Sequence, residues 1–461
     1  MRKFLLRAAP AVLFAALLLR WPGLDAMPFH TDEANNALLL DETLSAGKFN
    51  YRPHEHHGPT LFYLAAPWCR ALGVGRLADM EAWQLRAVTV GCGALAAASV
   101  LLLAPWLGRL AAVIGALTVA GAAPLHYYNR VFIHESLLLP LTVWLLAALW
   151  RWRDTRRWRW AVAGGVLAGL MVATKENAAV TVALVAWPFL LPADGQRAGR
   201  VWPSLLVMAL AALTVVLALI GPRNLWLALL PHTARGLDSG HNHPWWQYFV
   251  WFGSWRGPGL PWSAWLGALA AGVAAVNWRR LPAARVLAPA LGGLLLFHCL
   301  LPYKTPWLMA VPLLLLLLLA APGWAMVCRR LPRPALALPV AAVLALTLAE
   351  TWSRSFRHQV AADNPLAYAP TSPAAAGITR DLPADRDAVI QVVAEDYWPL
   401  PWLLRKYPRV GYWTAAPQRW PGEVLICSPA ALGWVPEIGD WRFTARELRP
   451  GVTVLIGVRH E

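Results

Sequence analysis

Long apolar runs separated by short polar segments dominate residues 1–352. Runs long enough to cross a bilayer as helices, roughly 17 to 25 residues each, lie near residues 5–23, 84–106, 109–126, 136–150, 203–222, 262–278, 284–301, 306–327 and 334–352. A further apolar stretch, residues 159–193, is interrupted by Lys175, Glu176 and Asn177, and we divide it into two short spans that turn at these polar residues. The pattern therefore predicts a multi-pass α-helical membrane protein with about eleven transmembrane helices.

Basic residues cluster in alternate connections between these runs. The clusters are Arg2, Lys3 and Arg7; Arg109; Arg151, Arg153, Arg156, Arg157 and Arg159; Arg197 and Arg200; Arg279, Arg280 and Arg285; and Arg329, Arg330 and Arg333. Because loops kept in the cytoplasm hold the excess of Lys and Arg, we expect a cytoplasmic N-terminus in the inner membrane. An odd number of spans then places the C-terminus outside, with residues 24–83, 126–135, 223–261 and the turn at Tyr303–Trp307 on the outer face.

Two parts of the chain are expected to lie outside the bilayer. In the first outer loop, residues 34–47 and 59–73 have the spaced apolar residues of two short helices on the membrane surface. After residue 352 the hydropathy falls: residues 387–396, 422–428 and 452–459 read as strands and 398–407 as a short helix. We therefore divide the chain into a membrane domain, residues 1–352, and a small extracytoplasmic α/β domain, residues 353–461.

Composition supports this reading and excludes others. Of the 461 residues, 58% are hydrophobic and only 14% charged, which places most of the chain in lipid. The formal charge of +16 would suit nucleic acid, but the basic residues lie between apolar runs instead of along one face, so no nucleic-acid partner is expected. Five scattered cysteines form no CxxC pair, and no glycine-rich phosphate loop supports nucleotide binding. The basic, apolar N-terminus lacks a convincing cleavage site, and we interpret it as an uncleaved first span.

The sequence HTDE, His30 to Glu33, places two adjacent carboxylates directly beyond the first span. A carboxylate there would act as general base on an incoming hydroxyl or amine, or bind a metal. The alternative is a helix N-cap, with Thr31 or Asp32 starting the helix that follows. The residues alone leave both interpretations open.

The same loop carries HEHHGP, His54 to Pro59. In an extended segment His54 and His56 point to one side and make candidate metal ligands. The alternative, which we favour for these residues, is a solvated polar turn ended by Gly58 and Pro59. Contact of one histidine with substrate is more plausible than a zinc site built from all of them.

Three cations stand near the outer ends of spans, against the topology bias: Arg130, Lys175 and Lys304. Each needs a partner, either a lipid phosphate or an acidic side chain such as Glu135 or Glu176. Snorkelling to the headgroup level is the alternative for each residue alone. The aromatic segment His241 to Phe249 is interpreted mainly as an interfacial anchor.

Four motifs together carry a family resemblance. The combination of HTDEANNALLL, HGPTLFYL, YKTPW and DYWPLPWLLRKYPRVGYW resembles the C-superfamily of membrane glycosyltransferases (GT-C), which includes the dolichyl-phosphate-mannose protein mannosyltransferases. More closely, it is similar to the archaeal and bacterial family of flippase-activity-associated membrane proteins found in N-glycosylation gene neighbourhoods. The resemblance covers the whole chain.

The resemblance implies an inverting glycosyltransferase. It would take a sugar from a polyprenyl-phosphate donor in the lipid bilayer and pass it to an acceptor glycan, lipid or protein on the outer side. The superfamily's first-loop base maps onto Asp32, with Glu33 as its neighbour, and the phosphate-binding cations map onto Lys304 and Arg130, and less securely onto Lys175. The expected substrate-binding residues are His57, Arg130, Glu135, Lys175, Tyr303 and Lys304. The one candidate cofactor is a divalent metal, with His54 and His56 as its candidate ligands.

One departure from the superfamily pattern concerns the turn after the third span. An acidic residue often follows an arginine there, whereas in this chain Arg130 is followed by His134 and then Glu135. This departure leaves the role of Glu135 open.

Two other functions fit parts of the pattern. A lipid-linked glycan flippase or transporter would also use membrane cations, although it predicts charges deep within several spans, whereas here they cluster at span ends. An assembly partner in glycan export would need no carboxylate. Replacement of Asp32 by Asn separates the enzyme from these alternatives.

Overall fold

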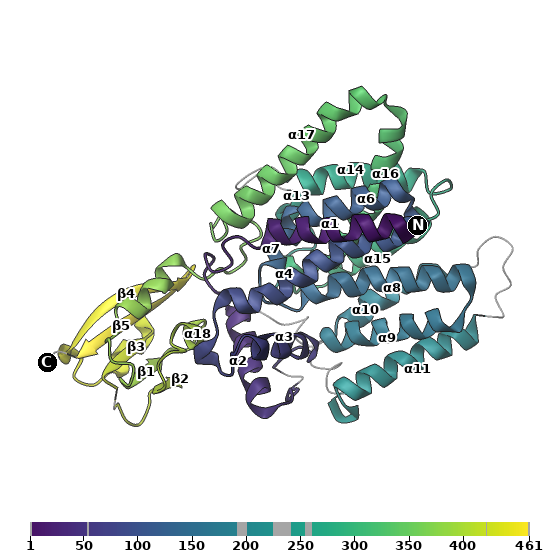
Figure 1. The fold of residues 1–461 in the computed structure, drawn as a ribbon. Helices are drawn as coiled ribbons and strands as arrows, with labels where there is room; N and C mark the ends of the chain where they lie inside the picture. Colours follow the sequence, from purple (N-terminus) through teal and green to yellow (C-terminus); the bar gives the residue numbers. More distant parts are fainter. Residues whose placement is uncertain are drawn as a thin grey trace.

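The computed structural model describes residues 2–52, 55–190, 201–224, 241–253, 261–420 and 422–459, and within them every apolar stretch expected to span the membrane is helical. These helices are α1 (Arg2–Arg20), α4 (Ala82–Ser99), α6 (Arg109–Gly121), α8 (Glu135–Thr155), α9 (Trp158–Thr174), α10 (Ala178–Leu190), α11 (Trp202–Leu219), α14 (Trp262–Val276), α15 (Ala284–Leu300), α16 (Ala310–Arg330) and α17 (Arg333–Trp352). They pack side by side as a bundle, with α17 along one edge (Figure 1).

Few of these helices are both long enough and apolar enough to span a membrane without a neighbouring segment. Among the described residues, three helical segments are long and apolar enough to cross a membrane by themselves: Ala82–Leu107, Trp202–Leu219 and Pro306–Arg330. A fourth forms if α6 and α7 (Ala123–Asn129), which meet at a 57° bend, count as one span. The multi-pass helical membrane fold is thereby confirmed, while the number of eleven spans stays a prediction.

Charged residues interrupt the bundle where the sequence predicts a turn. Helix α9 ends at Thr174 and α10 begins at Ala178, so Lys175, Glu176 and Asn177 form the break between them. A short 3₁₀ segment, Pro306–Met309, likewise precedes α16. Both breaks lie at the end of the bundle that carries the first loop. Polar side chains from the breaks and from the loop line a common cavity there.

The first loop contains the two expected helices. Helix α2 spans Thr31–Ala46 and α3 spans Thr60–Ala71, against the predicted ranges 34–47 and 59–73. Their apolar faces share a buried cluster with residues of α4, in which the rings of Phe49 and Phe62 stack at 4.6 Å between centroids. Burial of these faces fixes the direction in which the N-terminus of α2 points.

The C-terminal region forms a five-stranded mixed sheet, ordered β2-β1-β3-β5-β4. The strands are β1 (Ile390–Val393), β2 (Val410–Trp413), β3 (Val424–Cys427), β4 (Trp441–Arg449) and β5 (Val452–Arg459), with α18 (Leu400–Leu403) between β1 and β2. Strand β1 pairs in parallel with β2 and β3, whereas β5 is antiparallel to β3 and β4. The expected C-terminal α/β fold is confirmed; β2 and β4 had not been predicted as strands.

The sheet lies beyond one end of the bundle, and α2 and α18 lie between the two (Figure 1). Trp402 of α18 stacks on Phe29, which precedes α2, with ring centroids 3.8 Å apart. Arg405 donates to the Met80 carbonyl at 3.0 Å and pairs with Glu81 at 3.0 Å. The sheet is therefore fixed against the first loop. The domain boundary at residue 352 stays a prediction.

The remaining helical segments described are short. They are η1 (Leu77–Asp79), η2 (Val100–Leu103), α5 (Ala104–Leu107), α13 (Gln247–Gly253), η5 (Ser353–Arg357), η6 (Pro373–Arg380), η7 (Pro429–Trp434) and η8 (Ile438–Asp440).

Candidate active-site cavity

The N-terminus of α2 is capped by His30. Its ring Nδ1 accepts a hydrogen bond from the Asp32 backbone N at 3.1 Å, and its own backbone N donates to Glu33 Oε2 at 2.9 Å. These two bonds form a capping box, which satisfies backbone N–H groups at the helix start. Capping therefore falls to His30 and Glu33, whereas the sequence had suggested Thr31 or Asp32.

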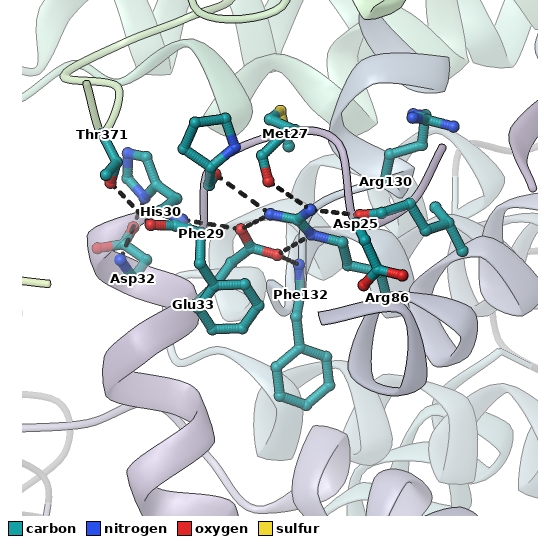
Figure 2. Close-up of polar contacts among 12 residues, drawn as sticks. Asp25, Met27, Phe29, His30, Asp32, Glu33, Arg86, Arg130, Phe132 and Thr371 are labelled. Atoms are coloured by element: carbon teal, nitrogen blue, oxygen red, sulfur yellow. Dashed lines mark hydrogen bonds and ion pairs between the residues drawn. The ribbon is translucent and has the colours of Figure 1, made fainter. Parts of the chain in front are cut away.

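Glu33 is wholly buried and forms an ion pair with Arg86 of α4 (Figure 2). Its Oε1 accepts from Arg86 Nε at 2.8 Å and from the Phe132 backbone N at 2.8 Å. Its Oε2 accepts from Arg86 Nη2 at 2.6 Å and from the His30 backbone N. Each carboxylate oxygen thus has two donors, which leaves no acceptor position for a substrate proton. The structure places Glu33 in the framework of the loop, so we do not retain it as a catalytic residue.

Asp32, the next residue towards the N-terminus, has a different environment. Its side chain lines a polar cavity of about 160 Å³, and no other described residue donates a hydrogen bond to its carboxylate. The cavity is lined by Asp32, Asn35, Asn36, Glu55, His56, His57, Ile133, His134, Glu135, Lys175, Tyr303 and Trp307. Of the two adjacent carboxylates, Asp32 is therefore the one available to a ligand.

Lys175 contributes a buried cation to the same cavity. It lies in the break between α9 and α10, and its Nζ forms an ion pair with Glu135 at the start of α8. Both side chains are almost wholly buried, and each supplies the other's counter-charge. The pairing of Lys175 with an internal acidic residue, which the sequence had suggested, is present.

His57 enters the cavity wall from the first loop. Its Nδ1 lies 2.9 Å from Glu176 Oε2, and Glu176 Oε1 accepts from the Tyr51 hydroxyl at 2.5 Å. Burial and the Glu176 carboxylate raise the pKa of Tyr51 above its usual range, so the phenol stays protonated and donates. Glu176 thereby fixes the orientation of the His57 ring, as carboxylates do for histidines that bind metals or transfer protons.

The two candidate metal ligands were His54 and His56. His54 lies outside the described residues. His56 Nε2 accepts from Arg52 Nε at 2.9 Å, and burial together with the Arg52 guanidinium lowers the pKa of His56. Within the described part of the chain, no group of three or more His, Cys, Asp or Glu side chains is placed to hold a metal ion.

Two of the three expected phosphate-binding cations do not line the cavity. The Arg130 guanidinium donates to the backbone carbonyls of Arg20, Pro22 and Gly23 and lies over the Phe356 ring. Lys304 Nζ donates to the Leu301 carbonyl. The neighbouring Tyr303 does line the cavity, beside Trp307. We therefore assign Arg130 and Lys304 to the support of the outer segments and keep Lys175 as the phosphate-binding candidate.

Gly58 explains the HGP motif in physical terms. A Cβ atom at this position would lie 2.0 Å from the Ala173 carbonyl oxygen at the end of α9. The close approach allows Thr60 to donate to Thr174 at 2.7 Å and brings His57 to Glu176. The loop is thus packed directly on the break that contains Lys175.

We expect Gly58→Ala to displace this loop and to disturb His57 and Lys175 together. Overpacking of this kind costs about 1–3 kcal/mol of stability, and a displacement of about 1 Å at a site lowers rates by about 100-fold. Thermal unfolding and sugar transfer would be measured beside Gly75→Ala, a change in the same loop where a Cβ meets nothing within 4 Å. Equal behaviour of the two variants would contradict the packing role of Gly58.

Sequence reasoning missed Arg86, which holds the acidic motif in place. Arg86 lies near the start of the predicted span 84–106, and a cation within a span needs a buried partner. That signal was present, but the partner, Glu33, is 53 positions away in the chain. Asn35, Asn36, His134 and Trp307 line the cavity but had not been selected as site residues, although the two asparagines lie in HTDEANNALLL and the tryptophan in YKTPW. Tyr51, which donates to Glu176 behind the cavity wall, was missed as well.

Comparison with known proteins gives a family model and solved structures with the same fold. The family model for dolichyl-phosphate-mannose-protein mannosyltransferase matches residues 57–226. A search of curated protein sequences gave no match. ArnT from Cupriavidus metallidurans, solved bound to undecaprenyl phosphate, is 16% identical, with a TM-score of 0.68 over 97% of each chain. Archaeal oligosaccharyltransferase AglB from Archaeoglobus fulgidus, solved with an inhibitory peptide and a dolichol-phosphate, is 14% identical, with a TM-score of 0.55 over 93% of this chain and 70% of that one.

The structural likenesses show a common fold, and the family model adds a sequence link to the mannosyltransferases. The family model covers less than half of the chain, and both comparisons agree with the GT-C resemblance that the four motifs carry. The finer likeness to the flippase-activity-associated family stays a prediction.

Proposed function

We propose that this chain transfers a sugar from a polyprenyl-phosphate-linked donor to an acceptor on the extracytoplasmic side of the cytoplasmic membrane. The observation that carries the proposal is the shared polar cavity. In it the Asp32 carboxylate, which has no hydrogen-bond donor among the described residues, lies beside the cation Lys175 and the histidine His57. A base and a phosphate-binding cation are the two groups that such a transfer requires. The undecaprenyl phosphate bound to ArnT and the dolichol-phosphate bound to AglB support a lipid phosphate as the donor's leaving group.

In the proposed reaction Asp32 takes the proton from the acceptor hydroxyl or amine as that atom attacks the anomeric carbon. The new glycosidic bond forms as the bond between the anomeric carbon and the donor phosphate breaks, and the departing electron pair remains on the phosphate oxygen. Lys175 donates hydrogen bonds to the phosphate and stabilises its developing charge, and His57 does the same when both of its ring nitrogens carry protons. A single displacement of this kind inverts the configuration at the anomeric carbon.

The other cavity residues support these groups. Glu135 and Glu176 hold Lys175 and His57 in place before the donor arrives. Tyr303 and Trp307 offer aromatic surface beside the polar groups, which suits the hydroxylated and apolar faces of a sugar ring. The acceptor class stays open among glycan, lipid and protein.

The direct test is transfer of radiolabelled sugar from polyprenyl-phosphate donors by the full chain in nanodiscs. Product formation would establish the enzyme, and a second arm with chelator would show whether a divalent metal takes part. Absence of transfer from every donor, combined with movement of headgroup-labelled lipid across vesicles that contain the folded protein, would replace the enzyme by the flippase alternative.

We expect Lys175→Gln to weaken binding of polyprenyl phosphate by roughly 10- to 150-fold, because a charge-assisted hydrogen bond contributes about 1.5–3 kcal/mol. The single variant also leaves Glu135 buried without its counter-charge. The double variant Lys175→Gln/Glu135→Gln removes that penalty. It should recover thermal stability while binding stays weak, as measured by titration with the lipid phosphate. Wild-type affinity in the double variant would show that Lys175 only neutralises Glu135.

A further inference from the structure

A segment that leads into the C-terminal sheet passes over the start of α2. Residues 364–371, here called the strap, are joined to the sheet through the Ser372 backbone N, which donates to the Leu448 carbonyl at 2.8 Å. The Tyr128 hydroxyl of α7 donates to the Leu366 carbonyl at 3.0 Å, and the Thr371 hydroxyl donates to the Phe29 carbonyl at 2.7 Å. The strap is therefore held by hydrogen bonds near both of its ends, and Figure 2 shows Thr371 beside His30 and Asp32.

The hydrogen bonds of His30 define its protonation. Its Nδ1 accepts from the Asp32 backbone N, and its Nε2 lies 3.0 Å from the Tyr368 carbonyl oxygen, which can only accept. The ring is therefore the neutral tautomer with the proton on Nε2. Through this single ring the strap is connected to the backbone of Asp32, the proposed base.

Tyr368 also contacts the opposite wall of the cavity through its hydroxyl. The phenol oxygen lies 2.7 Å from His241 Nδ1 and 3.2 Å from His243 Nε2. These two histidines flank Asn242, which pairs with Tyr303 in an antiparallel bridge, and the Lys304 backbone N donates to the His241 carbonyl at 3.0 Å. Tyr303 and Asp32 both line the cavity, so Tyr368 connects the two segments that carry them.

The backbone beside Tyr368 is strained. Ala369 has a φ of 44°, a left-handed conformation that a residue with a Cβ adopts at an energetic cost. Such a conformation persists only where the surrounding contacts fix it, and here the hydrogen bonds of Tyr368 and Thr371 stand on either side. The strap is thus held in one shape by its contacts with the cavity walls.

We infer that Tyr368 is a positioning residue that sets the placement of Asp32 relative to the Tyr303 wall, so that the C-terminal region takes part in forming the active site. The inference rests on the proposed transfer reaction for its effect on rate, although the positioning itself is a property of the fold. A displacement of either wall by less than an ångström would alter the alignment of base, acceptor and donor phosphate.

The test uses two variants that each remove one connection. Tyr368→Phe keeps the ring and the carbonyl but deletes the contacts with His241 and His243. His30→Asn keeps a side-chain acceptor that caps α2 but no longer reaches the Tyr368 carbonyl. The matched control is Tyr407→Phe, which deletes a tyrosine hydroxyl donating to the Pro383 carbonyl at 3.2 Å within the C-terminal domain.

For both test variants we expect turnover to fall about tenfold while the Kd for polyprenyl phosphate changes less than twofold. Hydrogen exchange should become faster at residues 31–34 in His30→Asn and at 241–243 and 303–305 in Tyr368→Phe, with neither change in the control. Turnover within twofold of wild type and unchanged exchange in both variants would overturn the inference. If the wild-type chain transfers no sugar, the proposed function fails, whereas the exchange measurements still decide whether Tyr368 positions the two walls.

Discussion

Asp32→Asn is expected to reduce sugar transfer by about 10²- to 10⁴-fold, the range that a general base contributes. The amide has nearly the same shape as the carboxylate but does not accept the acceptor's proton. Because no other described residue donates a hydrogen bond to the Asp32 side chain, the change should leave the fold intact. Transfer of labelled sugar in nanodiscs and thermal unfolding would be measured on the same preparations.

The matched control is Asp79→Asn in the same loop. Asp79 is exposed and pairs with Arg76 at 3.2 Å, outside the cavity. Exposed pairs of this kind contribute at most about 1 kcal/mol, so the control should keep both stability and transfer. Near-normal transfer by Asp32→Asn would remove Asp32 from the role of base, and the acceptor's proton would then have to pass to another cavity group such as His57.

The parts of the fold that the sequence predicted are those set by local patterns. The break between α9 and α10 could be predicted because three polar residues interrupt an apolar run. The first-loop helices α2 and α3 could be predicted because their apolar residues recur at helical spacing. Strand β1 was visible as a short buried run. Strand β4 was missed because its outward residues are charged and its burial alternates irregularly around a bulge between Glu447 and Arg449.

The arrangement of the site depends on contacts between distant segments, which a single sequence does not disclose. Asp32 and Glu33 are alike in residue type and in position beyond the first span. Only the fold shows that Arg86 and the Phe132 backbone N bind the Glu33 carboxylate, whereas Asp32 lines the cavity. Arg130 and Lys175 both lie at span ends in the sequence, yet the Arg130 guanidinium donates its hydrogen bonds to three backbone carbonyls. Residue type and topology therefore suggested candidate groups, while packing decided which of them line the cavity.

Glu33→Gln is expected to act on folding instead of on chemistry. Removal of one partner from a buried ion pair costs about 3–5 kcal/mol, because the remaining charge is left without compensation. The charge left without a partner would be that of Arg86. Its guanidinium also donates to the Met27 carbonyl at 2.9 Å and so helps to hold the first loop in place. Thermal unfolding and yield of folded protein should fall sharply compared with Asp32→Asn.

A double-mutant cycle separates this structural role from catalysis. Glu33→Gln, Arg86→Gln and the double variant would be compared for apparent Tm, and the double variant should be more stable than the sum of the two single losses allows, because no unpaired charge remains. Transfer per folded molecule should fall far less in Glu33→Gln than in Asp32→Asn. A Glu33→Gln protein as stable as wild type but without transfer would instead return Glu33 to the catalytic role that the acidic pair suggests from sequence alone. Stability and transfer, measured together, therefore distinguish the structural role expected of Glu33 from the catalytic role expected of Asp32.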